Sequence, residues 1–207
     1  MLDVDKDAIK ELMEMEAVPV CDRLGSLLGR SVKMAVSKVE ETDTGALAEC
    51  LPHFNVVIEG RRAVNGLTAD QLYVFSKDDM IRVANYIMGV PVDNPSPLDE
   101  IALSTLKEVA SQCISAAMNE LNDLLGRDMG VSRIAAFDNT ERILEMIRIW
   151  KTDQSLLLVR LHYLIDGVVE SDAYIIASQA ISQVLGIPEL EELELEELAE
   201  SIQKPKE

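Results

Sequence analysis

The chain has 207 residues, of which 48% are hydrophobic and only 4% aromatic, so its length suits one compact domain with an aliphatic core. Its formal net charge of −18 disfavours nucleic acids and anionic membrane surfaces as partners, because both repel a polyanion. Neither a basic, apolar leader nor a run of 18 apolar residues is present, so we expect a cytoplasmic protein without membrane insertion.

A long helix is expected over residues 5–29. Asp7, Glu11 and Glu14 follow one another at intervals of three or four residues, which puts their side chains on one outer face of this helix. Pro19 has no N–H to donate within the helix, so we expect a kink or break just past Glu14.

Strand-like segments and a second helix complete the first half. β-branched and alternating residues predict strands over 31–41, 54–62 and 70–76, and helical periodicity follows over 77–89. The pair Arg61–Arg62 is interpreted as a turn that ends a hairpin, with contact to a partner as the alternative.

A second long helix is expected over about 99–126, after a linker at 91–99 that contains three prolines. One side of this helix carries an apolar stripe at helical spacing, typical of core packing: Leu106, Val109, Cys113, Ala117, Leu121 and Leu124. The opposite side carries polar residues: Ser104, Glu108, Ser111, Ser115 and Asn119.

The second half repeats this order of elements. Strands are expected over 130–137, 143–151, 155–166 and 172–178, and a helix over 178–186. Trp150 falls in the second of these strands, at the core or its rim. The acidic residues 189–207 form a tail whose leucines indicate a weak amphipathic helix. A solvated extension is the expectation there, with a docking helix or a linker towards a further domain as alternatives.

Three internal matches share one offset of 97 residues: "DAIKE" with "STLKE", "LGSLLGR" with "LNDLLGR", and "IMGVP" with "VLGIP". They predict a tandem duplication with halves of about 1–91 and 99–188. We therefore expect one α+β domain over 1–188, built from pseudo-twofold helix–strands–helix halves, with a mostly antiparallel sheet and helices packed on it.

The cysteines and histidines suggest no metal site. Cys21, Cys50 and Cys113 are widely spaced without a CxxC pair, so we expect free thiols in a reducing compartment. His53 and His162 have no Cys or His partner nearby in sequence, and a structural role is expected for both.

The heads of the two long helices carry the pattern Asp/Ser-x-x-x-Glu followed three residues later by a polar group, and both helices end in Leu-Leu-Gly. Over 1–188 the sequence resembles the CheC-type family, the chemotaxis phosphatases and flagellar-switch relatives that include CheC, CheX, FliY and the middle domain of FliM. The resemblance implies one CheC-like domain that binds a phosphorylated CheY-type receiver domain. It also implies hydrolysis of the aspartyl phosphate, with Mg²⁺ brought by the receiver and no cofactor of the chain's own.

In the family the motif glutamate engages the receiver and an asparagine orients the attacking water. Carried over to this sequence, the candidate catalytic residues are Glu11 and Glu14 in the first copy and Glu108 and Ser111 in the second. The asparagine is thus replaced by glutamate once and by serine once. The neighbouring candidates for partner binding are Asp7, Ser104, Gln112 and Ser115.

Three functions remain open on these residues. The first is a receiver-binding protein with or without phosphatase activity, in which Glu108 and Ser111 form the better site because Pro19 interrupts the first copy. The second is a non-catalytic interaction module that binds flagellar switch proteins or a CheD-like deamidase. The third is a sensory domain with a small ligand between the halves. A free-standing CheC-like protein fits better than a complete switch subunit, although the acidic tail leaves open a longer parent chain.

Overall fold

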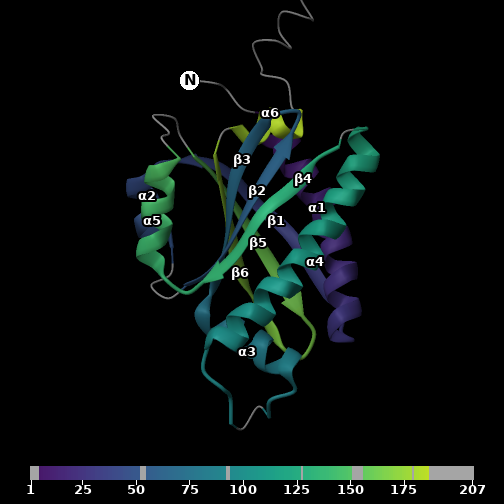
Figure 1. Ribbon diagram of the computed structural model, residues 1–207, viewed down its shortest axis with the longest axis vertical. Helices are drawn as coiled ribbons and strands as arrows, with labels where there is room; N and C mark the ends of the chain where they lie inside the picture. Colours follow the sequence, from purple (N-terminus) through teal and green to yellow (C-terminus); the bar gives the residue numbers. More distant parts are fainter. Residues whose placement is uncertain are drawn as a thin grey trace, which may run out of the picture.

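Helices and strands follow one another in the same order in both halves of the computed structural model (Figure 1), which describes residues 5–51, 55–91, 94–126, 128–150, 156–178 and 180–186. The first half contains α1 (Lys6–Leu28), β1 (Val32–Thr42), α2 (Thr44–Cys50), β2 (Asn55–Val64), β3 (Leu67–Ser76) and α3 (Lys77–Met88). The second contains α4 (Glu100–Leu125), β4 (Gly130–Phe137), α5 (Thr140–Ile149), β5 (Leu156–Ile165), β6 (Val169–Ser178) and α6 (Ala180–Leu185).

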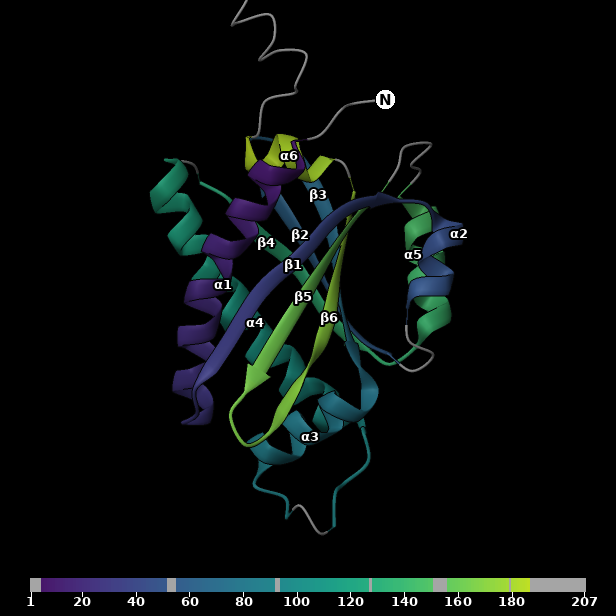
Figure 2. The same ribbon diagram turned by 180° about the vertical axis from the view of Figure 1, so that it is seen from behind.

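The strands form one sheet in the order β1-β5-β6-β3-β2-β4, and each neighbouring pair is antiparallel. Exchanging each strand for its counterpart, β1 for β4, β2 for β5 and β3 for β6, reproduces the same order in reverse. The predicted α+β fold with pseudo-twofold halves is therefore confirmed. Helices α1 and α4 cover one face of the sheet, and α2 and α5 lie against the other (Figures 1 and 2).

Glycines with a positive φ angle occur at equivalent positions in the two halves. Gly29 and Gly126 end α1 and α4 with φ of 63° and 61°, a conformation that glycine adopts without strain. Their offset of 97 is not constant along the chain, because the hairpin glycines Gly66 and Gly167 are 101 residues apart. The second half is longer than the first around α5 and shorter at α6. These two differences in length cancel, so that the offset is again 97 at the glycines that follow α3 and α6.

The strand predicted over 143–151 was wrong, because residues 143–149 belong to α5. The Asn139 side chain caps that helix by accepting from the backbone N–H of Glu141 at 2.9 Å. Ile143, Met146 and Ile147 then lie on one side at helical spacing and pack against the sheet. The sequence did not predict α2, and Trp150 ends α5 instead of lying in a strand.

Two further expectations concern the first half. The turn expected at Arg61–Arg62 was wrong, because both residues lie inside β2 and the hairpin turn comes later, at Asn65–Gly66. Of the kink or break expected at Pro19, the break does not occur, because α1 continues through this residue. The predicted tail at 189–207 lies outside the described residues, as do His53 and positions 92–93 of the linker. Within the described ranges, no helix combines the length and apolar composition needed to cross a bilayer.

Candidate docking site on the two long helices

Helices α1 and α4 lie side by side and run in opposite directions (Figures 1 and 2). The Arg23 guanidinium on α1 donates a hydrogen bond to the side-chain oxygen of Gln112 on α4. Gln112 in turn donates from Nε2 to Oε1 of Glu108 over 3.0 Å. A polar chain therefore crosses from one helix to the other and holds the Glu108 carboxylate in place.

We use the name α1/α4 face for the outer sides of the two helices, which carry the predicted site residues Asp7, Glu11 and Glu14 on α1 and Ser104, Glu108, Ser111, Gln112 and Ser115 on α4, together with Val18 on α1. Ser111 and Gln112 are half-buried and the others are exposed. Because the helices are antiparallel, the two motif copies lie towards opposite ends of this face. Glu11 is 12 residues from Arg23, or about 18 Å along the helix axis, so the structure does not bring it to Glu108.

Local contacts differ between the two copies. In the first, Lys10 lies 3.9 Å from the Glu14 carboxylate as an exposed ion pair, one helical turn apart. In the second, the Ser115 hydroxyl donates to the backbone carbonyl of Ser111 over 2.8 Å. The second copy, with the chain from Glu108 to Arg23, is the more extensively hydrogen-bonded of the two.

Exposed apolar side chains accompany the polar ones. Among the described residues six large hydrophobic side chains are exposed, and five of these lie on α1 or α4: Met15, Val18, Leu27, Ile101 and Leu124. Val18 and Ile101, at 61% and 69% exposure, are the most open of the six. Apolar side chains set among charges are typical of a protein interaction surface. The apolar stripe read from the sequence had placed Leu124 in the core, which was wrong.

A buried ion pair fixes α1 to the sheet beneath this face. Glu16 Oε2 accepts from Nη2 of Arg62 over 2.6 Å, and Nε of Arg62 donates to Gln71. Arg62 is only 1% exposed. Burial by itself would lower the pKa of Arg62, but the Glu16 carboxylate reverses this and holds the pKa above its ordinary value. The sequence missed this pair, although Glu16 falls on the buried stripe three residues after Met13.

The side chains of Cys21 and Cys113 are described, and both are free thiols, as predicted. Burial raises the pKa of Cys113 to about 11, and burial also raises the pKa of the half-buried Cys21. Both thiols therefore stay protonated at neutral pH and are poor nucleophiles. His162 lies on β5, where its Nδ1 is 3.1 Å from an Asp172 oxygen.

Comparison with solved structures gives clear matches, whereas no protein-family model and no curated protein sequence matches the chain. FliY from Thermotoga maritima is similar with a TM-score of 0.74 and 23% identity, over 87% of this chain and 92% of that one. A chain of the FliG–FliM complex from H. pylori is similar with a TM-score of 0.64 and 11% identity, over 87% of this chain and 96% of that one. CheX from Desulfovibrio desulfuricans is similar with a TM-score of 0.53 and 8% identity, over 81% of this chain and 98% of that one. These likenesses confirm the CheC-like fold.

Proposed function

We propose that this chain, which has the CheC-like fold of chemotaxis and flagellar-switch proteins, docks a phosphorylated CheY-type receiver domain on its α1/α4 face. The observation that carries the proposal is that five of the six exposed large hydrophobic side chains lie on the two helices that bear both motif copies. Such side chains supply association energy when a partner covers them, and the surrounding carboxylates select a partner with complementary charge.

Glu108 is the proposed anchor of this contact. Gln112 holds one of its oxygens, so that an incoming donor meets a carboxylate whose rotamer is already fixed and little side-chain entropy is lost on binding. Ile101 lies seven residues away on the same side of α4 and offers an apolar contact beside it.

Docking without turnover is favoured by the groups at and next to the asparagine positions. Gln112 has the amide best suited to orient a water, but that amide is engaged by Arg23 and Glu108. Glu14 would bring an anion next to a dianionic phosphoryl group, at a cost of about 1–4 kcal/mol. Hydrolysis is the second candidate function, and it would depend on the Ser111 hydroxyl placing a water in line with the aspartyl phosphate.

Switch proteins are the proposed wider setting. The compared structures include FliM in complex with FliG and FliM in complex with SpeE, both from H. pylori. By analogy, a flagellar switch protein is a second class of partner for this chain, and a CheD-like deamidase is a third.

Titration with a CheY-type receiver in two states tests the proposal. We expect the receiver carrying beryllium fluoride, which mimics the phosphoryl group, to bind at least tenfold more tightly than the unmodified receiver. Equal affinity for both states would contradict phosphoryl-dependent docking. Loss of labelled phosphate from the receiver, compared between the wild type and Ser111→Ala, tests hydrolysis. A wild-type rate equal to that of the receiver alone excludes turnover and leaves docking as the function.

A further inference from the structure

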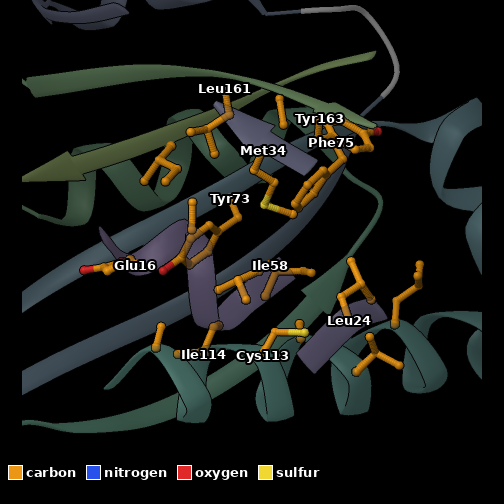
Figure 3. A pocket seen from close by; sticks show the side chains of 18 of the residues that line it. Glu16, Leu24, Met34, Ile58, Tyr73, Phe75, Cys113, Ile114, Leu161 and Tyr163 are labelled. Carbon is orange, nitrogen blue, oxygen red and sulfur yellow. The ribbon is translucent and has the colours of Figure 1, made fainter. Parts of the chain in front are cut away.

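An apolar cavity of about 150 Å³ lies beneath the α1/α4 face, between the inner sides of the two long helices and the sheet. Figure 3 shows it from close by, with side chains of the helices opposite side chains of the strands: Leu24, Cys113 and Ile114 opposite Met34, Phe75 and Leu161. Both halves of the chain contribute equivalent positions. The offset of 97 pairs Glu16 with Cys113, the offset of 101 pairs Arg62 with Tyr163, and all four line the cavity.

The cavity arises because small side chains face it. Ala17 on α1, Ala110 and Ala117 on α4, and Ala173 on β6 all border the space. The buried Glu16–Arg62 pair lies at one end and fixes the distance between α1 and β2, so the helix does not settle into the gap. With only 4% aromatic residues, the chain has few rings that could fill such a volume.

The polar groups at the Glu16–Arg62 end of the cavity are already engaged. Arg62 is hydrogen-bonded to Glu16 and Gln71, and the Tyr73 hydroxyl lies 3.4 Å from both Arg62 and Gln71. Tyr163 borders another part of the cavity, where its buried hydroxyl has no hydrogen-bond partner among the described residues and offers a water a single polar contact. A buried water needs two to four polar partners, whereas an apolar cavity of this volume stays dry and accepts benzene or xenon.

Flexible side chains around the cavity allow a guest to be accommodated. Four methionines line it: Met13, Met34, Met80 and Met118. A methionine side chain is unbranched and has three rotatable bonds, so it adapts to the shape of a ligand with little strain.

We propose that this cavity is a binding site for an uncharged, apolar small molecule of about the size of benzene, held between the two halves of the chain. The guest contacts α1 and α4 from below, so binding stabilises the pair of helices that carry the α1/α4 face. The proposal concerns the interior and stands independently of which protein docks on the outer face.

Nuclear magnetic resonance of the protein labelled at its methionine methyl groups tests this site, with benzene as the titrant. We expect saturable shifts of the four lining methionines with a dissociation constant on the order of 1 mM, while the exposed Met15 gives no saturable shift. Benzoate, which has the same ring with a charge, should give no such shifts, because its carboxylate would be buried while Arg62, the cation of the lining, is already paired with Glu16. Absence of saturable shifts with benzene, or equal shifts with benzoate, would overturn the proposal.

A substitution that fills the cavity provides a second test. Ala117→Leu places extra volume in the cavity and should abolish the benzene-dependent shifts and the accompanying rise in melting temperature. Asn119→Leu adds the same side chain to the exposed side of α4 and should retain both effects. Retention of the shifts in folded Ala117→Leu would place benzene elsewhere and contradict the site. Should Ala117→Leu not fold, the wild-type titration with benzene and benzoate alone decides.

Discussion

Arg62 has the largest of the fully buried side chains among the described residues, and its charge is balanced by Glu16. A buried pair of this kind adds little net stability compared with apolar residues of the same volume, because both charges lose their hydration. Loss of one partner is costly, since the other charge then stays buried alone. The pair thus acts mainly as a specific link between α1 and β2.

Removal of Glu16 should therefore have a large effect. We expect Glu16→Ala to lower the free energy of unfolding by about 3–5 kcal/mol in urea denaturation, because the Arg62 guanidinium stays desolvated without its counterion. Glu14→Ala, which removes the exposed contact with Lys10, serves as the control. It should change the free energy of unfolding by less than about 1 kcal/mol. Equal effects of the two substitutions would show that Arg62 reaches solvent once unpaired.

The contacts of Asp172 predict that the folded state becomes less stable at low pH. Hydrogen bonds from Arg160 and then from His162 hold the pKa of the Asp172 carboxyl below its usual range. The folded-state pKa is thus lower than the unfolded-state pKa of about 4, so this contribution is present above pH 4 and is lost as the pH falls through the folded-state pKa. In urea unfolding between pH 5 and pH 2, the wild type should lose more stability than Asp172→Asn. Parallel curves would contradict the assignment.

At the scale of elements, α1 and α4 differ most at Pro19. The offset of 97 pairs this proline with Ala116 of α4. Pro19 withholds the N–H that would donate to the Met15 carbonyl, and proline inside a helix is about 3 kcal/mol less favourable than alanine.

A reciprocal exchange tests this difference. Pro19→Ala should raise the free energy of unfolding by about 1–3 kcal/mol, because it restores a hydrogen bond in α1. The matched change Ala116→Pro should lower it by about 3 kcal/mol or more, and urea denaturation measures both. A less stable Pro19→Ala protein would mean that the packing of α1 depends on the proline.

Helix α5 shows where the sequence misleads. Its isoleucines favour a strand by composition, yet Ile143, Met146 and Ile147 also fit helical spacing, and the Asn139 cap decides the outcome. The long helices were easier to predict, because helical periodicity that continues over more than 20 residues does not fit a strand. The Asn65–Gly66 dipeptide, a strong signal for a two-residue hairpin, would have placed Arg62 inside β2.

At the scale of the whole molecule, the duplication was predictable because repeated helix ends and glycine caps survive in both halves. The exposed polar face was predictable as well, since helical periodicity orients Ser104, Glu108 and Ser115 without knowledge of contacts. Three features were not predictable from the sequence: the Arg23–Gln112 link, the Glu16–Arg62 pair and the cavity. Each of them depends on the register between elements far apart in sequence, which periodicity within one element does not determine.

The central claim is that the α1/α4 face docks a phosphorylated receiver, and a pair of charge reversals tests it most directly. Glu108→Lys changes the proposed anchor, and Glu145→Lys makes the same change on the exposed side of α5, across the sheet. In titrations with the phosphorylated receiver, Glu108→Lys should weaken binding at least tenfold, whereas Glu145→Lys should leave the dissociation constant within about twofold of the wild type. Equal affinities for both variants, or a larger loss with Glu145→Lys, would contradict the account.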